Sequence, residues 1–233
     1  YNTTIFPGYE KQDLIRYTSG DRRARWTAAK DAAKAVIDLG VYSLYKGNPS
    51  ASENIPQNLT EIFLNKSTEE DIFIKYFTTP MGQRAGLYTS PNGYHGWGTN
   101  APLGDMVDAF EMKDGTPFSW SDPAAAADPY ANRDPRFYST ILYNGAEWRI
   151  RPDDAKGLDP LNRIQTGRWE KWNTSTNKME VVYGVDTRKS TIEDWNGAYT
   201  GYYLRKYIDP NVDAQYVRQA VTWRFIRYAE VLL

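Results

Sequence analysis

The chain has 233 residues, with 28 Lys and Arg against 29 Asp and Glu, and is long enough for one substantial core or two small ones. The charge balance gives no bias toward DNA, RNA or an anionic membrane surface. The absence of cysteine excludes a disulfide scaffold, a thiolate nucleophile and cysteine-type metal sites. The sequence shows no run of about 18 apolar residues that would predict a membrane span, and no signal peptide at its start.

The first predicted element is a helix between Asp21 and Gly40. Asp21 is a suitable N-cap, and Gly40 can end the helix in a left-handed conformation. Small apolar residues between them form two stripes, which predicts two close neighbours, as in stacked helical hairpins. A period of about 34 residues, typical of tetratricopeptide repeats, does not recur in the sequence to establish that architecture.

Three further elements are predicted before residue 120. Residues 59–64 predict a short helix, and the alternation over 71–77 predicts a strand. A loop rich in glycine and aromatic residues occupies 80–100. Pro102 then fits the first turn of an amphipathic helix that Asp114-Gly115 ends.

Residues 132–150 predict a hairpin. The Asp134-Pro135 pair favours an extended entry, and the β-branched and aromatic residues over 137–143 alternate as in a strand. Asn144-Gly145 tolerates a positive φ at both centres of a type I′ turn. We therefore expect a hairpin that closes on Trp148.

The polar stretch 151–200 predicts a second hairpin, in which 168–172 pairs with 179–183. Much of the rest of this stretch is predicted as loop, and long ordered loops are commonly functional. The segment from Trp223 predicts a helix with one buried stripe, which stops at Leu233 without a cap. We therefore expect the chain to be the middle and later part of a longer protein.

The amino-acid sequence of five collinear segments resembles the SusD/RagB family, the glycan- or peptide-capturing lipoproteins of the outer membrane in Bacteroidetes. The segments are AAKDAAKAVIDLGVYSLY (28–45), PLGDMVDAFEMKDGTPF (102–118), NRDPRFYSTILYNGAEW (132–148), GYYLRKYIDP (201–210) and WRFIRYAEVLL (223–233). The resemblance implies a mainly α fold with loop-rich regions and small β-hairpins, built in the full protein on a tetratricopeptide-type helical scaffold. It assigns 1–233 to a single SusD-like region, incomplete at both ends.

The resemblance also implies a function. It describes a non-catalytic protein exposed at the surface of the outer membrane, held by a lipid on a cysteine upstream of Tyr1. Such a protein captures oligosaccharide and passes it to a SusC-like TonB-dependent transporter. A peptide-capturing RagB-like member and a secreted glycoside hydrolase fragment are the alternatives.

Motifs for catalysis are missing from the sequence. His95 is the only histidine, and there is no G-x-S-x-G, H-E-x-x-H, P-loop or G-x-G-x-x-G. We expect no enzyme activity, no cofactor and no metal. A carboxylate pair for glycoside cleavage meets in space rather than in sequence, so the hydrolase alternative stays open.

Aromatic residues make up 15% of the chain, and several lie in the polar loop LYTSPNGYHGWGTN (87–100). A sugar ring stacks on an exposed aromatic face and bonds planar donors, and the glycines beside Trp97 would leave room for it. The candidate ligand-binding residues are Arg84, Tyr88, Tyr94, His95, Trp97 and Asn100, and Asn92 is also available to bond sugar hydroxyls. The alternative is that Trp97 lies in the core and the glycines only let the chain turn. A second aromatic group is the fallback site: Trp169, Trp172, Trp195 and Tyr199.

Overall fold

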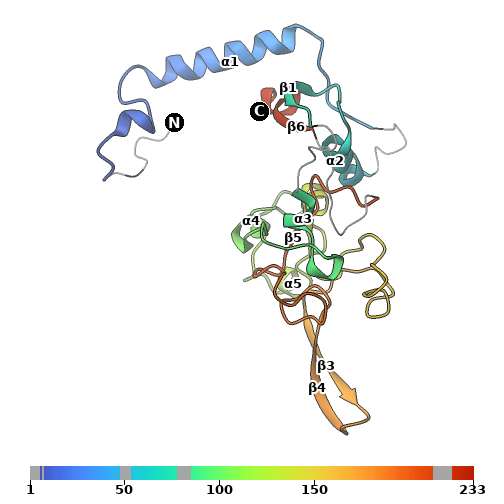
Figure 1. Ribbon diagram of the computed structural model, residues 1–233. Helices are drawn as coiled ribbons and strands as arrows, with labels where there is room; N and C mark the ends of the chain where they lie inside the picture. The colour runs from blue at the N-terminus through green and yellow to red at the C-terminus, as the bar shows by residue number, and fades with distance from the viewer. Residues whose placement is uncertain (1–5, 7, 48–53, 78–84, 212–221) are drawn as a thin grey trace. The chain divides into compact units, whose positions relative to one another are not determined.

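The computed structural model describes residues 6, 8–47, 54–77, 85–211 and 222–233 (Figure 1). These residues divide into two compact units. The first unit comprises the described residues up to Leu44 together with Glu69–Phe73 and Arg224–Leu233. The second comprises the described residues of Tyr45–Thr68 and Ile74–Trp223. No helix among the described residues is long and apolar enough to cross a lipid bilayer.

The first unit contains the predicted N-terminal helix, α1 (Arg22–Asp38), which follows the 3₁₀ turn η1 (Gln12–Leu14). The Asp21 carboxylate caps it by accepting a hydrogen bond from the Arg23 backbone N–H, and Gly40 follows it with φ +63°. These ends confirm the prediction. Neither apolar stripe of α1 is covered within the described residues, because the helix holds no buried residue there.

The first unit also contains Asp71–Phe73 of β1 (Asp71–Lys75) and all of β6 (Trp223–Arg227) except Trp223. These two strands pair, and α7 (Tyr228–Val231) follows β6. Arg224 Nε lies 2.6 Å from Asp71 Oδ1, and both side chains are buried. The strand prediction at 71–75 is therefore confirmed. The prediction of a helix from Trp223 is wrong for the first five residues. They form the strand β6, which pairs with β1 and brings Arg224 to the buried carboxylate of Asp71.

The second unit begins with α2 (Ile55–Leu64), which Asn54 caps by accepting a hydrogen bond from the Gln57 backbone N–H. The predicted helix at 59–64 is thus confirmed as the later part of α2. This helix buries Ile62 and Phe63 and packs against α6 (Pro135–Thr140). Three short helical elements follow α2: α3 (Ala85–Thr89), η3 (Asn92–Tyr94) and α4 (Gly104–Asp108).

The helix predicted from Pro102 to the Asp114-Gly115 turn is only α4. Beyond it the chain leaves the helix, because Met112 forms a β-bridge with Arg133 and Glu111 O accepts a hydrogen bond from Asp134 N. The turn at Gly115 exists, with φ +84°, but it follows an extended segment. Another short helix, α5 (Pro123–Ala127), lies between the two bridged segments.

The strand predicted over 137–143 is mostly a helix, α6, so this prediction is wrong. Pro135 stands in the first turn, where its missing N–H costs nothing, and Asp134 caps the helix through the Arg136 backbone N–H. Only β2 (Ile141–Leu142) is extended. It pairs antiparallel with β5 (Tyr203–Leu204), a segment distant in sequence.

A turn does form at Asn144-Gly145, but not as predicted. Ala146 N donates to Tyr143 O, and only Gly145 has a positive φ, of +90°, which matches a type II turn rather than type I′. The residues after the turn pair with 162–164: Ile164 N donates to Ala146 O. The predicted hairpin closing on Trp148 is therefore wrong.

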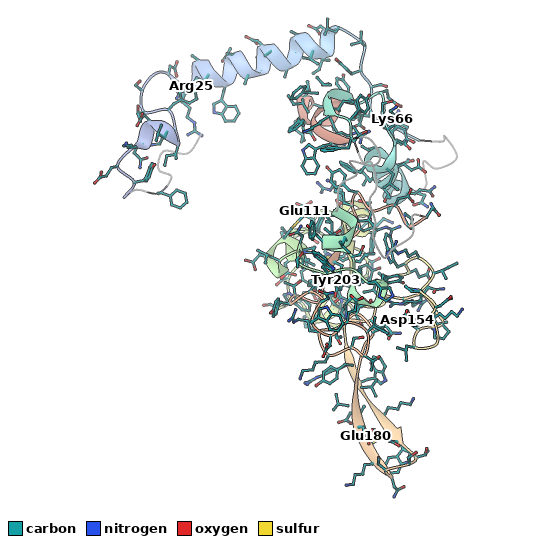
Figure 2. The ribbon with its side chains drawn as sticks, in the orientation of Figure 1. Arg25, Lys66, Glu111, Asp154, Glu180 and Tyr203 are labelled. Atoms are coloured by element: carbon teal, nitrogen blue, oxygen red, sulfur yellow. The ribbon has the colours of Figure 1, made fainter. Side chains whose placement is uncertain are left out.

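The second predicted hairpin is confirmed with its register. β3 (Arg168–Asn173) pairs with β4 (Lys178–Tyr183), Arg168 lies opposite Tyr183, and Trp172 lies opposite Met179. The hairpin projects from the second unit as a two-stranded arm (Figure 1). The label of Glu180 in Figure 2 lies on this arm.

The core of the second unit consists of two apolar clusters on either side of β2. Leu142 belongs to the cluster with Tyr94, Ile164 and Tyr203, while Ile141 belongs to the other, with Val107 and Phe137. Successive strand residues point to opposite faces, so this short strand joins both clusters. Figure 2 shows Tyr203 among the dense side chains of this region.

Candidate functional site

The loops of the second unit are held by a buried cation, Arg151. Its guanidinium donates to Asp159 Oδ2 and to both oxygens of Asp186, each at 2.7 Å, and stands 4.1 Å from the centre of the Tyr94 ring. We call these four residues the Arg151 hub. Burial lowers the pKa of Arg151, but the hydrogen bonds and charge of Asp186 outweigh burial and raise it, so the guanidinium stays charged.

Tyr94 is a member of the core and not a ligand contact. Its side chain is completely buried, and its hydroxyl donates to Arg149 O at 2.9 Å. Burial raises the pKa of this hydroxyl. The neighbouring Asn92 is buried too and donates to Thr187 O and Ile192 O. Tyr94 therefore leaves the set of candidate ligand-binding residues.

His95 connects two loops. Its Nδ1 lies 2.9 Å from Glu193 Oε1 and its Nε2 lies 3.2 Å from Asp154 Oδ1. The backbone of His95 is left-handed, with φ +59°, which turns the chain between Tyr94 and Gly96. Both ring nitrogens already have carboxylate partners, so the geometry favours a structural role for His95.

Trp97, Tyr88 and Asn100 meet at the surface. The Trp97 side chain is 39% exposed, and its ring meets the edge of the Tyr88 ring at 5.3 Å between centroids. Asn100 is exposed, and its backbone N–H donates to Tyr88 O. The Trp97 side chain therefore lies at the surface, with part of its ring packed against Tyr88. Arg84, the remaining candidate, lies outside the described residues.

The glycines around Trp97 serve close packing, which corrects the interpretation that they leave room for a ligand. A Cβ on Gly96 would overlap the carbonyl group of Ser90. A Cβ on Gly98, which has φ +57°, would lie 2.8 Å from Gly197 Cα. The loop thus needs glycine at both positions because other backbone segments pass directly beside it.

Half of the fallback aromatic group lies beside the same loop. Gly197 N donates to Trp97 O at 3.2 Å, and Trp195 and Tyr199 stand two residues on either side of Gly197, 70% and 88% exposed. We call this meeting of 85–100 with 192–201 the loop junction. Its exposed aromatic side chains are Trp97, Trp195 and Tyr199, and Tyr88 beside Trp97 is half-buried.

The other half of the fallback group is on the β3–β4 arm and is not a single platform. Trp169 and Trp172 are about half exposed. They are separated by an odd number of positions along one strand, so they point to opposite faces of the arm.

A pocket of about 360 Å³ opens next to the loop junction. It is lined by 166–168, Tyr183, 186–189 and 198–201. Arg188 lies 4.1 Å from the centroid of the Tyr199 ring and donates to Gly197 O at 3.2 Å. We call it the basic pocket. Sequence reasoning missed Arg188 and Lys189, although a basic pair in a loop shortly before Trp195 was a usable signal.

Metal chemistry has no visible basis in the described part of the chain. No three His, Asp or Glu side chains gather there in a way that could hold a metal ion. The arrangement offers instead aromatic faces, amide groups and cations at a surface, which is the chemistry of ligand binding.

Comparison with solved structures finds SusD-like proteins. A SusD-like carbohydrate-binding protein of Bacteroides fragilis superimposes with a TM-score of 0.63 at 24% identity, over 90% of this chain and 35% of its own. A second SusD-like protein of B. fragilis gives 0.60 at 24% identity, over 89% and 38%. The chain thus spans little more than a third of these proteins. At this identity the likeness shows the fold, which confirms the predicted SusD-like architecture.

Comparison of the sequence with curated proteins finds no match. The model of the SusD family, in contrast, matches residues 61–233, well over half of the chain. The match covers the last turn of α2, both core clusters, the loop junction and the basic pocket. This chain belongs to the SusD family.

Proposed function

We propose that this chain is the ligand-holding part of a non-catalytic protein of the cell surface that captures oligosaccharide and passes it to a TonB-dependent transporter of the outer membrane. A lipid anchor outside this chain would hold it there. The observation that carries the proposal is the loop junction, where two distant segments that carry exposed aromatic residues are joined by the hydrogen bond from Gly197 N to Trp97 O.

The chemistry of the loop junction suits a sugar. A pyranose has an apolar C–H face rimmed by hydroxyl groups, so it needs an aromatic ring beside planar donors and acceptors. Trp97 and Tyr199 offer rings, and Asn100 offers an exposed amide. The matched B. fragilis protein described as carbohydrate-binding supports the proposal by analogy of fold.

Two carboxylates near the loop junction, Asp186 and Glu193, are engaged in structural contacts, which supports binding rather than cleavage. A glycosidase holds two carboxyl groups roughly 5 to 9.5 Å apart around the bond that it breaks. Here Asp186 is buried against Arg151, and Glu193 accepts from Asn196 and contacts His95. These acids have structural partners in place of a substrate.

A glycan array on the purified protein tests the proposal first, followed by calorimetric titration of the strongest ligand. Loss of an aromatic anchor removes roughly 1 to 3 kcal/mol of binding, so Trp97→Ala should weaken affinity about tenfold to a hundredfold. Trp120→Ala is the matched control, since Trp120 is an exposed tryptophan outside the loop junction. Its affinity should equal that of the wild type.

Three outcomes would contradict the proposal. The first is an array without any bound glycan, and the second is an equal loss of affinity in both variants. The third is release of reducing sugar from a bound glycan, which would establish the hydrolase alternative. If Trp97→Ala lowers the melting temperature and leaves affinity unchanged, Trp97 is a core residue and the binding surface belongs to Trp195 and Tyr199.

A further inference from the structure

The basic pocket has three cationic side chains without carboxylate partners. Arg168, Arg188 and Lys189 line it, and none of them forms an ion pair with a carboxylate in the described part of the chain. Arginines elsewhere do find such partners: Arg224 pairs with Asp71, and Arg163 pairs with Glu147. Arg133 and Arg205 have no carboxylate partner in the described residues either, but they donate to backbone carbonyl groups. What distinguishes the basic pocket is that three such cations line one opening.

Asp186, the single acidic residue in the pocket lining, does not neutralise these cations. It is buried, and its two oxygens accept hydrogen bonds from Arg151 and from Gln165 N. The Arg151 hub as a whole has one cation against two carboxylates, which leaves one negative charge beneath the pocket. Three positive charges outweigh it.

The pocket's aromatic rings hold two of the cations in place. Arg188 stacks on Tyr199 at 4.1 Å while donating to Gly197 O. Lys189 Nζ lies 3.4 Å from the Tyr183 hydroxyl, and this contact lowers the pKa of Tyr183, with a smaller effect from Arg168. A side chain already ordered by such contacts loses less entropy when it binds an anion.

We propose that the basic pocket binds an anionic substituent, a carboxylate or a sulfate, on a sugar of the captured glycan. The inference rests on the proposed function and narrows its substrate to acidic oligosaccharides. A volume of about 360 Å³ lies within the range of small-molecule sites. Guanidinium and ammonium groups bind carboxylate and sulfate oxygens through short, charge-assisted hydrogen bonds, and exposed Tyr199 adds a stacking face.

Pairs of glycans that differ only in charge test this inference by calorimetric titration at fixed ionic strength. Oligogalacturonate is compared with its methyl ester, and oligosaccharides of a sulfated galactan are compared with the same oligosaccharides after desulfation, which makes them neutral. We expect at least a tenfold preference for the charged member of one pair. The first pair reports a carboxylate subsite and the second a sulfate subsite.

Single substitutions then test whether the cations of the basic pocket cause the preference for the charged glycan. Lys189→Gln and Arg168→Gln should each weaken the preferred acidic glycan about tenfold, which corresponds to ~1.4 kcal/mol, and leave the neutral member unchanged. Lys178→Gln is the matched control: it removes the same charge from the β3–β4 arm outside the pocket lining. It should change neither affinity, and melting curves should be the same for all variants.

The outcomes separate this inference from the proposed function. Equal affinity for charged and neutral members overturns the anion-binding role of the basic pocket and leaves glycan capture intact. An equal loss in Lys178→Gln and Lys189→Gln also overturns it, because the attraction would then come from overall charge. If neither member of either pair nor any arrayed glycan binds, both proposals fall.

Discussion

The Arg151 hub and the β3–β4 arm belong to the same unit and are stabilised in opposite ways. The hub is buried and joins segments far apart in sequence through charged and polar groups, such as Arg151 with Asp186. The arm is exposed and joins neighbours, such as Trp172 with Met179. Removing one partner in the hub leaves a buried charge uncompensated, whereas removing one in the arm exposes side chains that water already reaches.

The largest effect is expected for Arg151→Met. Two buried carboxylates, Asp159 and Asp186, would lose the cation that they share, and breaking such a network costs about 3 to 5 kcal/mol. Urea unfolding followed by tryptophan fluorescence measures the loss. Arg163→Met is the control, because its partner Glu147 is exposed and the pair is worth under about 1 kcal/mol. Equal losses in the two variants would contradict the distinction drawn above.

A smaller loss is expected for Tyr203→Phe. The Tyr203 hydroxyl donates to Asp186 O at 2.7 Å and accepts from Ala198 N at 3.0 Å, so the change leaves buried groups without partners. The free energy of unfolding should fall by about 1 to 3 kcal/mol. Tyr199→Phe, at a hydroxyl in solvent, should unfold as the wild type does. Wild-type stability of Tyr203→Phe would show that the hub does not depend on this bond.

Gly145→Val tests a purely conformational cost at a turn next to the core. No atom lies within 4 Å of a Cβ at Gly145, so the expected cost of about 1 to 2 kcal/mol comes from its φ of +90° alone. Thermal unfolding measures it. Gly157→Val is the control, since Gly157 has equal space and no positive φ. The turn assignment is wrong if both variants melt together.

The smallest effect is expected on the arm. Trp172 and Met179 face one another across the strands and are about half exposed, so their coupling should be about 0.2 to 1 kcal/mol. A double-mutant cycle with Trp172→Ala and Met179→Ala isolates the coupling. A value as large as the loss in Arg151→Met would mean that the arm is part of the cooperative core.

The same contrast explains which elements the sequence could predict. The register of β3 with β4 follows from one local turn and two short alternating runs. Asp134-Pro135 is ambiguous locally, because it favours an extended entry and also an N-cap with proline in the first turn. The partner of β2 is Tyr203–Leu204, far along the chain, and only that pairing limits the strand to two residues.

The candidate site divides in a similar way. The glycine-rich loop does carry an exposed Trp97, with Tyr88 half-buried beside it, and its role in ligand binding stays a prediction. Burial of Tyr94 depends on Arg149 and Arg151, more than fifty residues away, and local polarity gives no sign of it. The meeting of Trp97 with Gly197 is equally non-local, so Trp195 and Tyr199 seemed to form a separate group.

The bonds of Asn92 have a consequence for the order of folding. Asn92 reaches Ile192 across 100 positions, and Tyr203 reaches Asn92 across 111. Closing such long loops loses chain entropy before any contact repays it, and proteins rich in distant contacts fold slowly. The loop that displays Trp97 is therefore held by contacts that need the chain through Tyr203, whereas the pairing of the β3–β4 arm needs only its own sixteen residues, 168–183.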